Sequence, residues 1–286
     1  MYRYRSIYGV DFSGAKDAGK KIWIAEGVIE ESRLHIEKCE SAVTFLETSN
    51  DRDKCLSALS KFLASKGEAA IGLDFPFSLP REIVQKLFGV NNWEGLIQLF
   101  AERYSKHSEP ERFREDCRAS DGGHEVKRET DREVRAPWAA YNLKLYRQTY
   151  FGMREILAQL VRDKAVCVLP MQDALPGKPW LLEICPAATL KNLGLYGSPY
   201  KGKGEEQCKS RKHILQEIEK LGPLCIPDAN VRERVLQDQN GDALDSVLAA
   251  LATFRTISDP MALAAAKNEK YVLEGYIYVG IEETSS

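Results

Sequence analysis

The 286-residue sequence predicts an α/β protein whose mixed sheet is flanked by helices. Apolar, β-branched runs at 6–12, 21–29 and 31–39 follow one another closely, as the strands of an antiparallel meander do. Helical spacing of apolar residues over 51–65 is then followed by a short buried run at 69–75. A helix that crosses over between two strands is typical of a parallel pair, so the run at 69–75 is expected beside the first strand.

The middle of the chain predicts a mainly helical insertion at 81–165 within a single domain of residues 1–286. Residues 105–135 are almost entirely polar, and the stretch 102–135 holds nine Lys or Arg and ten Asp or Glu. One interpretation is a solvated loop or salt-bridged helix, and the other is a lid or substrate arm. The arm would use five arginines: Arg112, Arg114, Arg118, Arg128 and Arg132.

The sheet is expected to resume after the insertion. Residues 179–187 predict a fifth strand, which Pro186 closes. Helices are expected at 210–221 and 229–238, followed by a strongly apolar helix at 240–254. Residues 271–280 are expected to close the chain as a strand.

Composition limits the possible classes of protein. A net charge of −2 gives no overall attraction to nucleic acid, so such a substrate would need a local basic surface or metal ions. The seven cysteines include no C-x-x-C pair, which argues against a zinc site or a disulfide framework. The N-terminus lacks the pattern of a signal peptide, and no apolar run reaches the roughly 18 residues of a membrane span. A cytoplasmic protein is therefore expected.

Two strand ends carry the same short motif. GVDFSGA at 9–15 and GLDFPFS at 72–78 share a glycine, an aliphatic residue, an aspartate and a phenylalanine. If the two strands are parallel neighbours, Asp11 and Asp74 both lie at their carboxyl ends, where open α/β sheets bind ligands. Asp11 could instead cap a turn, but Asp74 is harder to explain as a surface residue because apolar residues and Pro76 flank it.

Three further acids are expected at the same end of the sheet. Asp242 and Asp245 lie three residues apart at the start of the apolar helix, where they could also cap it. Glu183 interrupts an apolar strand, and burying it would be costly unless it is paired, protonated or bound to a metal. Several carboxylates held together on rigid elements are what two-metal phosphoryl transfer requires.

A basic loop supplies candidate contacts to phosphate. Residues 199–213 hold five Lys or Arg against two Glu, which gives a local charge of +3, and Gly202 and Gly204 make the loop flexible. The residues expected to bind substrate are Ser13, Lys201, Lys203, Arg211 and Lys212.

At these residues the chain resembles domain-of-unknown-function family 429 (DUF429), a family of predicted nucleases. The resemblance runs through GVDFSGA, GLDFPFSLP, LLEICPAATL, GDALDSVLAALATF and EGYIYV, in that order. It implies a ribonuclease H-like fold, with a mixed five-stranded sheet, and a metal-dependent nuclease site like that of ribonuclease H and Holliday-junction resolvases. Asp11, Asp74, Asp242 and Asp245 would then hold the metal, and Glu183 matches the glutamate-proline element of the family.

The leading hypothesis is hydrolysis of phosphodiester bonds in DNA or RNA, with Mg²⁺ or Mn²⁺ held by the four aspartates and with Glu183 as a fifth catalytic acid. One alternative is an ATP-binding phosphotransferase or ATPase of the actin and sugar-kinase type. Such a protein needs a second glycine-rich phosphate loop, whereas this chain has DFPFSLP at 74–80. Another alternative is a non-catalytic binding protein that uses the insertion as an interaction arm.

Overall fold

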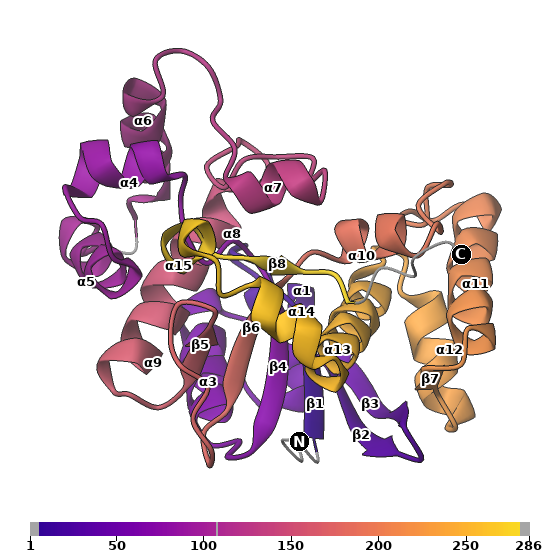
Figure 1. Ribbon diagram of the computed structural model, residues 1–286. Coiled ribbons are helices and arrows are strands. Elements are labelled where there is room, and N and C mark those ends of the chain that lie inside the picture. Colours follow the sequence, from indigo (N-terminus) through magenta and orange to yellow (C-terminus); the bar gives the residue numbers. More distant parts are fainter. Residues whose placement is uncertain (1–5, 107, 281–286) are drawn as a thin grey trace.

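The computed structural model describes residues 6–106 and 108–280 (Figure 1). Its strands form one mixed sheet in the order β5-β6-β4-β1-β2-β3-β7, with β8 paired to β6. The β1-β2-β3 meander is antiparallel, and every other strand pair is parallel. The strands are β1 (Ser6–Asp11), β2 (Trp23–Glu30), β3 (Arg33–Ser41), β4 (Ala69–Asp74), β5 (Cys167–Leu169), β6 (Trp180–Ile184), β7 (Leu224–Cys225) and β8 (Ile277–Tyr278).

Several helices lie where the sequence predicts them. The helix predicted at 51–65 is α3, and the one predicted at 229–238 is α12. The helices are α1 (Ala18–Lys21), α2 (Ala42–Phe45), α3 (Arg52–Ala64), α4 (Arg81–Phe88), α5 (Trp93–Arg103), α6 (Pro110–Ser120), α7 (Glu129–Glu133), α8 (Tyr146–Phe151), the π-helix η1 (Gly152–Leu157), α9 (Ala158–Arg162), α10 (Pro186–Asn192), α11 (Glu205–Lys220), α12 (Ala229–Gln237), α13 (Asp242–Ser258), α14 (Pro260–Ala265) and α15 (Glu269–Glu274). No helix in the described part of the chain is long and apolar enough to cross a membrane.

Three expectations about elements are corrected. The sheet has more than five strands, because β5 and β7 are only three and two residues long and leave no periodic pattern to detect. The strand expected at 271–280 is instead α15 followed by the two-residue β8, because Asn268 caps a helix and Gly275, at φ 82°, ends it. The helix expected at 210–221 already begins at Glu205, so part of the basic loop is helical.

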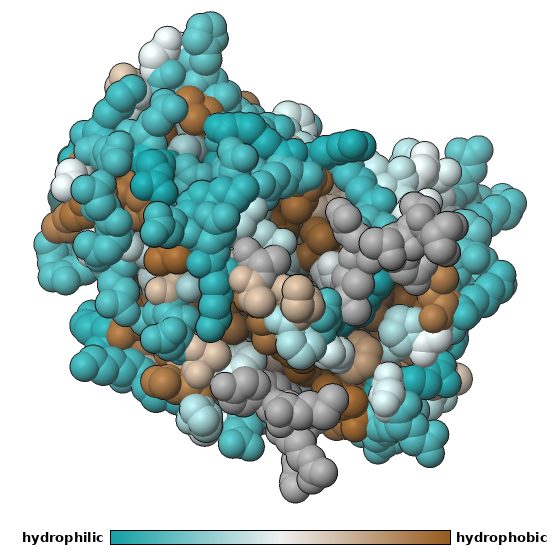
Figure 2. Space-filling model, in the orientation of Figure 1, coloured by the Kyte–Doolittle hydropathy of each residue, from teal (hydrophilic) through white to brown (hydrophobic). Residues whose placement is uncertain are grey.

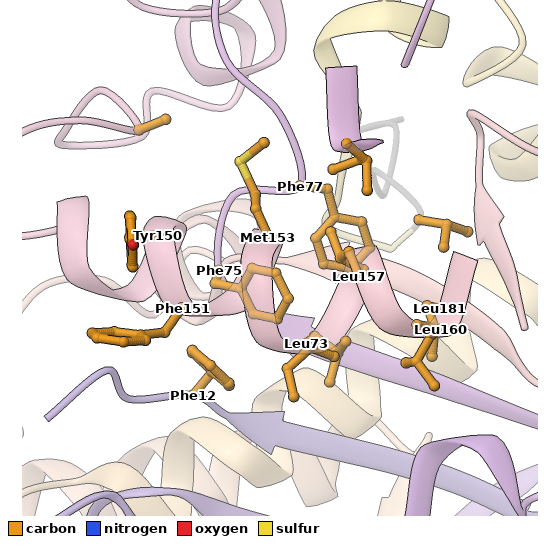
Figure 3. Close-up of a cluster of buried hydrophobic side chains, with 14 of the residues drawn as sticks. Phe12, Leu73, Phe75, Phe77, Tyr150, Phe151, Met153, Leu157, Leu160 and Leu181 are labelled. Atoms are coloured by element: carbon orange, nitrogen blue, oxygen red, sulfur yellow. The ribbon is translucent and has the colours of Figure 1, made fainter. Parts of the chain in front are cut away.

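The end of the insertion covers one face of the sheet. Figure 3 shows Phe12, Leu73 and Phe75 of the sheet side meeting Met153 and Leu157 of η1. The approach is close, since a Cβ on Gly152 would lie 2.3 Å from the ring of Phe75. Residues 146–162 are therefore a layer of the core, together with α3. Helices α4–α6, at the upper left of Figure 1, pack against this layer, with α5 on η1 and α9 and α6 on α8.

Helix α13 lies directly on the opposite face of the sheet, across β1, β2 and β4. Two glycines make this possible. A Cβ on Gly9 would lie 2.0 Å from Ser246 O, and a Cβ on Gly72 would lie 2.2 Å from Thr253 Oγ1 and 2.9 Å from Ala249 O. No side chain fits at either position, so the glycines set the distance between helix and sheet.

The same glycines determine which face the strand-end aspartates share. Side chains alternate along a strand, so Asp11 points to the same face as Gly9, and Asp74 to the same face as Gly72. The intervening Val10 and Leu73 belong to the core on the η1 side. Both aspartates are thereby directed toward the side of the sheet that α13 covers.

We expect Gly9→Ala to lower the free energy of unfolding by about 3 kcal/mol or more, because the methyl group would overlap the α13 backbone. Urea denaturation followed by circular dichroism measures this. Gly197→Ala is the matched control, since nothing lies within 4 Å of its Cβ position, and it should change stability by less than about 1 kcal/mol. Equal stability of the two variants would contradict the close packing of α13.

Candidate acidic site

Asp11 and Asp74 form the base of the site. The parallel register pairs them directly, so both carboxyl groups leave the same end of neighbouring strands. Asp11 is buried, and Asp74 is partly buried. Burial and the nearby Asp245 raise the pKa of Asp11 well above its usual value. Burial, Asp245 and Glu183 raise the pKa of Asp74 to about 8, against the opposing effects of Lys201 and a hydrogen bond with Asp11.

The first turn of α13 adds two more aspartates. Gly241, at φ 80°, turns the chain into the helix, and Asp245 N donates to Gly241 O over 2.9 Å. Asp245 is buried on the side facing Asp11 and Asp74, whose pKa values it raises. Asp242 is partly buried, and desolvation raises its pKa to about 6 although Lys201 acts in the opposite direction.

A loop before α11 supplies the groups that compensate Asp245. Tyr200 OH donates to Asp245 Oδ1 over 2.7 Å, and Lys201 Nζ lies 2.5 Å from Asp245 Oδ2. Desolvation disfavours the charged ammonium, but Asp245, Asp11 and Asp74 more than offset this and raise the pKa of Lys201. The acid cluster therefore holds one internal cation, whose side chain is 52% exposed.

Arg211 holds this loop in place. Its Nη1 donates to Tyr200 O over 2.7 Å and to Gly202 O over 3.2 Å, and its Nε donates to Leu236 O over 2.8 Å. The side chain is buried. Arg211 thus supports the backbone that presents Tyr200 and Lys201.

The other residues expected to bind substrate are not gathered at the acids. Lys203 and Lys212 are exposed, and Lys212 lies on α11. Ser13 follows Asp11 closely, and its Oγ accepts a hydrogen bond from Ala15 N over 3.3 Å. Of the predicted basic residues, Lys201 is the one that the structure brings into contact with an aspartate of the site.

Glu183 lies on the other face of the sheet. It pairs with Leu73 in the β4–β6 register, and strand alternation therefore points it away from the face of Asp74. Arg128 binds it in a two-pronged manner, with Nη2–Oε1 2.5 Å and Nη1–Oε2 2.9 Å. Phe77 N also donates to Oε2 over 2.9 Å. Burial still raises the pKa of Glu183, although Arg128 limits the rise.

Arg128 comes from the polar stretch of the insertion and is itself fully buried. It also binds Asp131, with Nη2–Oδ1 2.7 Å and Nε–Oδ2 3.1 Å, and its Nη1 donates to Glu274 O over 3.1 Å. This ion network joins the insertion, β6 and the C-terminal segment. From the sequence, Arg128 is predicted only as one of five arginines of a possible substrate arm. A run of mixed charges does not indicate which of its arginines is buried.

A pocket of about 530 Å³ opens beside the acids. Its lining includes Asp74, Asp245 and Lys201, and also Glu183 with its partner Arg128. Its walls come from the insertion, through Trp138, and from the segment between α10 and α11, through Tyr196. Figure 2 shows the surface hollowed between these two parts, with hydrophobic residues inside the hollow.

Carboxylate oxygens are the ligands that Mg²⁺ and Mn²⁺ prefer, so the donor chemistry of the four aspartates fits such an ion. In this structure, however, the side chains are not arranged as ligands around an ion. Within residues 6–106 and 108–280, no group of three or more His, Cys, Asp or Glu side chains is placed to hold a metal. Both oxygens of Asp245 are instead engaged by Tyr200 and Lys201.

A comparison with protein-family models identifies the family of the chain. A family model described as "Protein of unknown function (DUF429)" matches residues 9–262. The chain belongs to this family. The DUF429 match spans β1 to α14 and so includes Asp11, Asp74, Asp242 and Asp245. No curated protein and no solved structure matches the chain. The family description names no activity, so the function has to be argued from the site.

We expect Glu183→Ala to lower the free energy of unfolding by about 3–5 kcal/mol, because it leaves Arg128 buried with half of its charge compensation. Urea denaturation measures the loss. The control is Glu205→Ala, which breaks an exposed pair with Lys209 and should cost less than about 1 kcal/mol. If the two variants lose the same stability, the buried network does not hold the insertion to β6.

Proposed function

We propose that the chain is a metal-dependent nuclease of the ribonuclease H-like type, which hydrolyses phosphodiester bonds with Mg²⁺ or Mn²⁺ held by Asp11, Asp74, Asp242 and Asp245. The observation that carries the proposal is the meeting of carboxylates from three separate elements, β1, β4 and α13, at one end of the sheet. A protein gains no stability from grouping like charges in this way. Such grouping is typical of sites that bind cations or do chemistry.

The order of elements supports the finer assignment. The antiparallel β1-β2-β3 meander, β4 parallel beside β1, and a C-terminal helix packed on the same sheet follow the arrangement that the DUF429 resemblance implies. The positions of the acids support the proposal: Asp11 ends β1, Asp74 ends β4, and Asp242 and Asp245 begin α13.

Binding of the ion requires Lys201 to leave Asp245. The ammonium lies on Asp245 Oδ2 and half of its side chain is exposed, so it has room to move toward solvent. We infer that Lys201 compensates the acids in the metal-free protein and contacts a phosphate oxygen of the substrate in the loaded one. Tyr200 stays on Oδ1 and keeps the carboxylate of Asp245 oriented.

Divalent ions at such a site activate a water molecule and stabilise the leaving oxygen of the phosphodiester. The protein's own part is positional. Asp11 and Asp74 project from the two central strands, and Asp245 projects from a helix that glycine contacts hold at a fixed distance, so none of the three depends on a flexible loop. The pocket beside them gives the substrate a route to the acids.

The phosphotransferase alternative fits the loop after β4 poorly. A phosphate loop presents several free backbone amides. Here Pro76 has no N–H, and Phe77 N already donates to Glu183 Oε2. A non-catalytic binding protein is the remaining alternative, and it predicts that the acids bind no Mn²⁺ even at millimolar concentration.

We expect Asp11→Asn to lower Mn²⁺-dependent cleavage at least about 100-fold, since loss of even an outer partner costs a metal site up to that factor. Labelled single-stranded, duplex, hybrid and branched nucleic acids are the substrates to test. Asp163→Asn, an exposed aspartate at the end of α9, is the control and should cleave as the wild type does. Undiminished cleavage by Asp11→Asn would rule out the proposed site.

We expect Lys201→Met to bind Mn²⁺ at least about fivefold more tightly than the wild type, because it removes a cation that competes for Asp245. Isothermal titration calorimetry measures the affinity. Lys203→Met removes the same charge from the same loop at an exposed position and should leave the affinity nearly unchanged. Weaker Mn²⁺ binding by Lys201→Met than by Lys203→Met would show that the ammonium does not occupy the place of the ion.

A further inference from the structure

The walls of the pocket carry aromatic rings with no role in the metal site. Trp138 is 38% exposed and Tyr196 is 52% exposed, which is unusual for residues of this size. Both line the pocket, Trp138 from the insertion and Tyr196 from the segment after α10. Neither ring belongs to the buried hydrophobic clusters of the core.

The ammonium group of a lysine lies over each of these rings. Lys144 Nζ lies 4.7 Å from the centre of the Trp138 ring, and Lys191 Nζ lies 4.9 Å from the centre of the Tyr196 ring. Lys191 Nζ also donates to Arg135 O over 2.6 Å, so this lysine ties the α10 side to the insertion. Aromatic faces paired with cations next to a hydrolytic site match the two parts of a nucleotide, the base and the phosphate.

The size of the pocket favours an unpaired base. A volume of about 530 Å³ is in the range of pockets that take one small molecule, and it is too small for a double helix. A base that is still paired and stacked has no face free to lie on an aromatic ring. Lys201 lines the same pocket and binds Asp245, so a phosphate attached to such a base would meet a cation beside the aspartates.

We propose that this pocket binds an unpaired nucleobase, which stacks on Trp138 and Tyr196 while Lys144 and Lys191 contact the flanking phosphates, and that the substrate is therefore single-stranded nucleic acid. This inference rests on the proposed nuclease function and narrows it to one substrate class. The aromatic rings would bind unpaired strands selectively, and the metal site at the aspartates would hydrolyse their phosphodiester bonds.

Fluorescence anisotropy with the full chain tests this. The protein carries Asp11→Asn so that strands stay intact, and binding is measured at low salt, once in Mn²⁺ and once in EDTA. The probes are a labelled single strand of about 10 nucleotides, its duplex, and the same strand with abasic sites. Trp138→Ala and Tyr196→Ala are each compared with Trp138→Phe and Tyr196→Phe, which keep a ring.

We expect the single strand to bind tighter than the duplex, each alanine variant to lose about tenfold in affinity for it, and each phenylalanine variant to keep most of the affinity. The affinity for the abasic strand should be the same in the alanine variants as in the parent protein. Met261→Ala, which removes an exposed apolar side chain on α14 that does not line this pocket, should bind as the parent does. No binding of single strands, preference for duplex, or full affinity in both alanine variants would overturn the proposal.

Cleavage assays separate this result from the proposed function. If single strands bind through Trp138 and Tyr196 but the protein with Asp11 intact cleaves no nucleic acid in Mn²⁺, the nuclease proposal fails and the pocket remains a single-strand site. If duplexes are cleaved and the alanine variants bind and cut normally, the nuclease proposal holds and the pocket assignment fails.

Discussion

Direct contact between the α13 backbone and two glycines is the constraint on which the rest of the site depends. Gly9 and Gly72 leave no room for a side chain between helix and sheet, so α13 can lie at only one distance from β1 and β4. Asp11 and Asp74 follow two residues later and share the glycines' face. One geometric requirement thus fixes where the first turn of α13 meets the strand ends, and with it the position of Asp245.

Bringing acids together is unfavourable, and the protein offsets the cost differently on the two faces of the sheet. On the α13 face, Asp245 is held by the buried Tyr200 and by Lys201, whose half-exposed side chain has room to move. On the other face, Glu183 is held by Arg128, which is fully buried and bound on every edge. The first arrangement suits a site that exchanges its cation, and the second suits permanent structure.

Some of this was predictable from the sequence. The repeated glycine and aspartate of GVDF and GLDF predicted two strands with equivalent ends, and the apolar run after Asp242 predicted the helix that is α13. Local pattern sufficed there because both features depend on alternation and helical period. The pairing of Glu183 with Arg128 depends on strand register, which places Glu183 opposite Leu73, and no local pattern encodes that register. The catalytic role expected for Glu183, which lines the same pocket as Asp74 and Asp245, stays a prediction.

The partners of the acids were harder to predict for a related reason. Arg128 is one of nine basic residues in a mixed-sign stretch, and its burial follows from long-range contacts with β6 and α15. Arg211 was expected at the substrate, yet it is buried beneath the loop that carries Tyr200. Trp138 and Tyr196 face one pocket only because the insertion folds back over the sheet.

The central claim is that the strand-end aspartates and Asp245 form one cation site once Lys201 has moved. Anomalous X-ray diffraction from crystals of the full chain grown in Mn²⁺ tests it most directly. The account predicts a manganese peak bounded by Asp11, Asp74 and Asp245, with the Lys201 ammonium displaced from Asp245. Crystals that hold no manganese at these aspartates, with Lys201 still bound to Asp245 at saturating Mn²⁺, would contradict it.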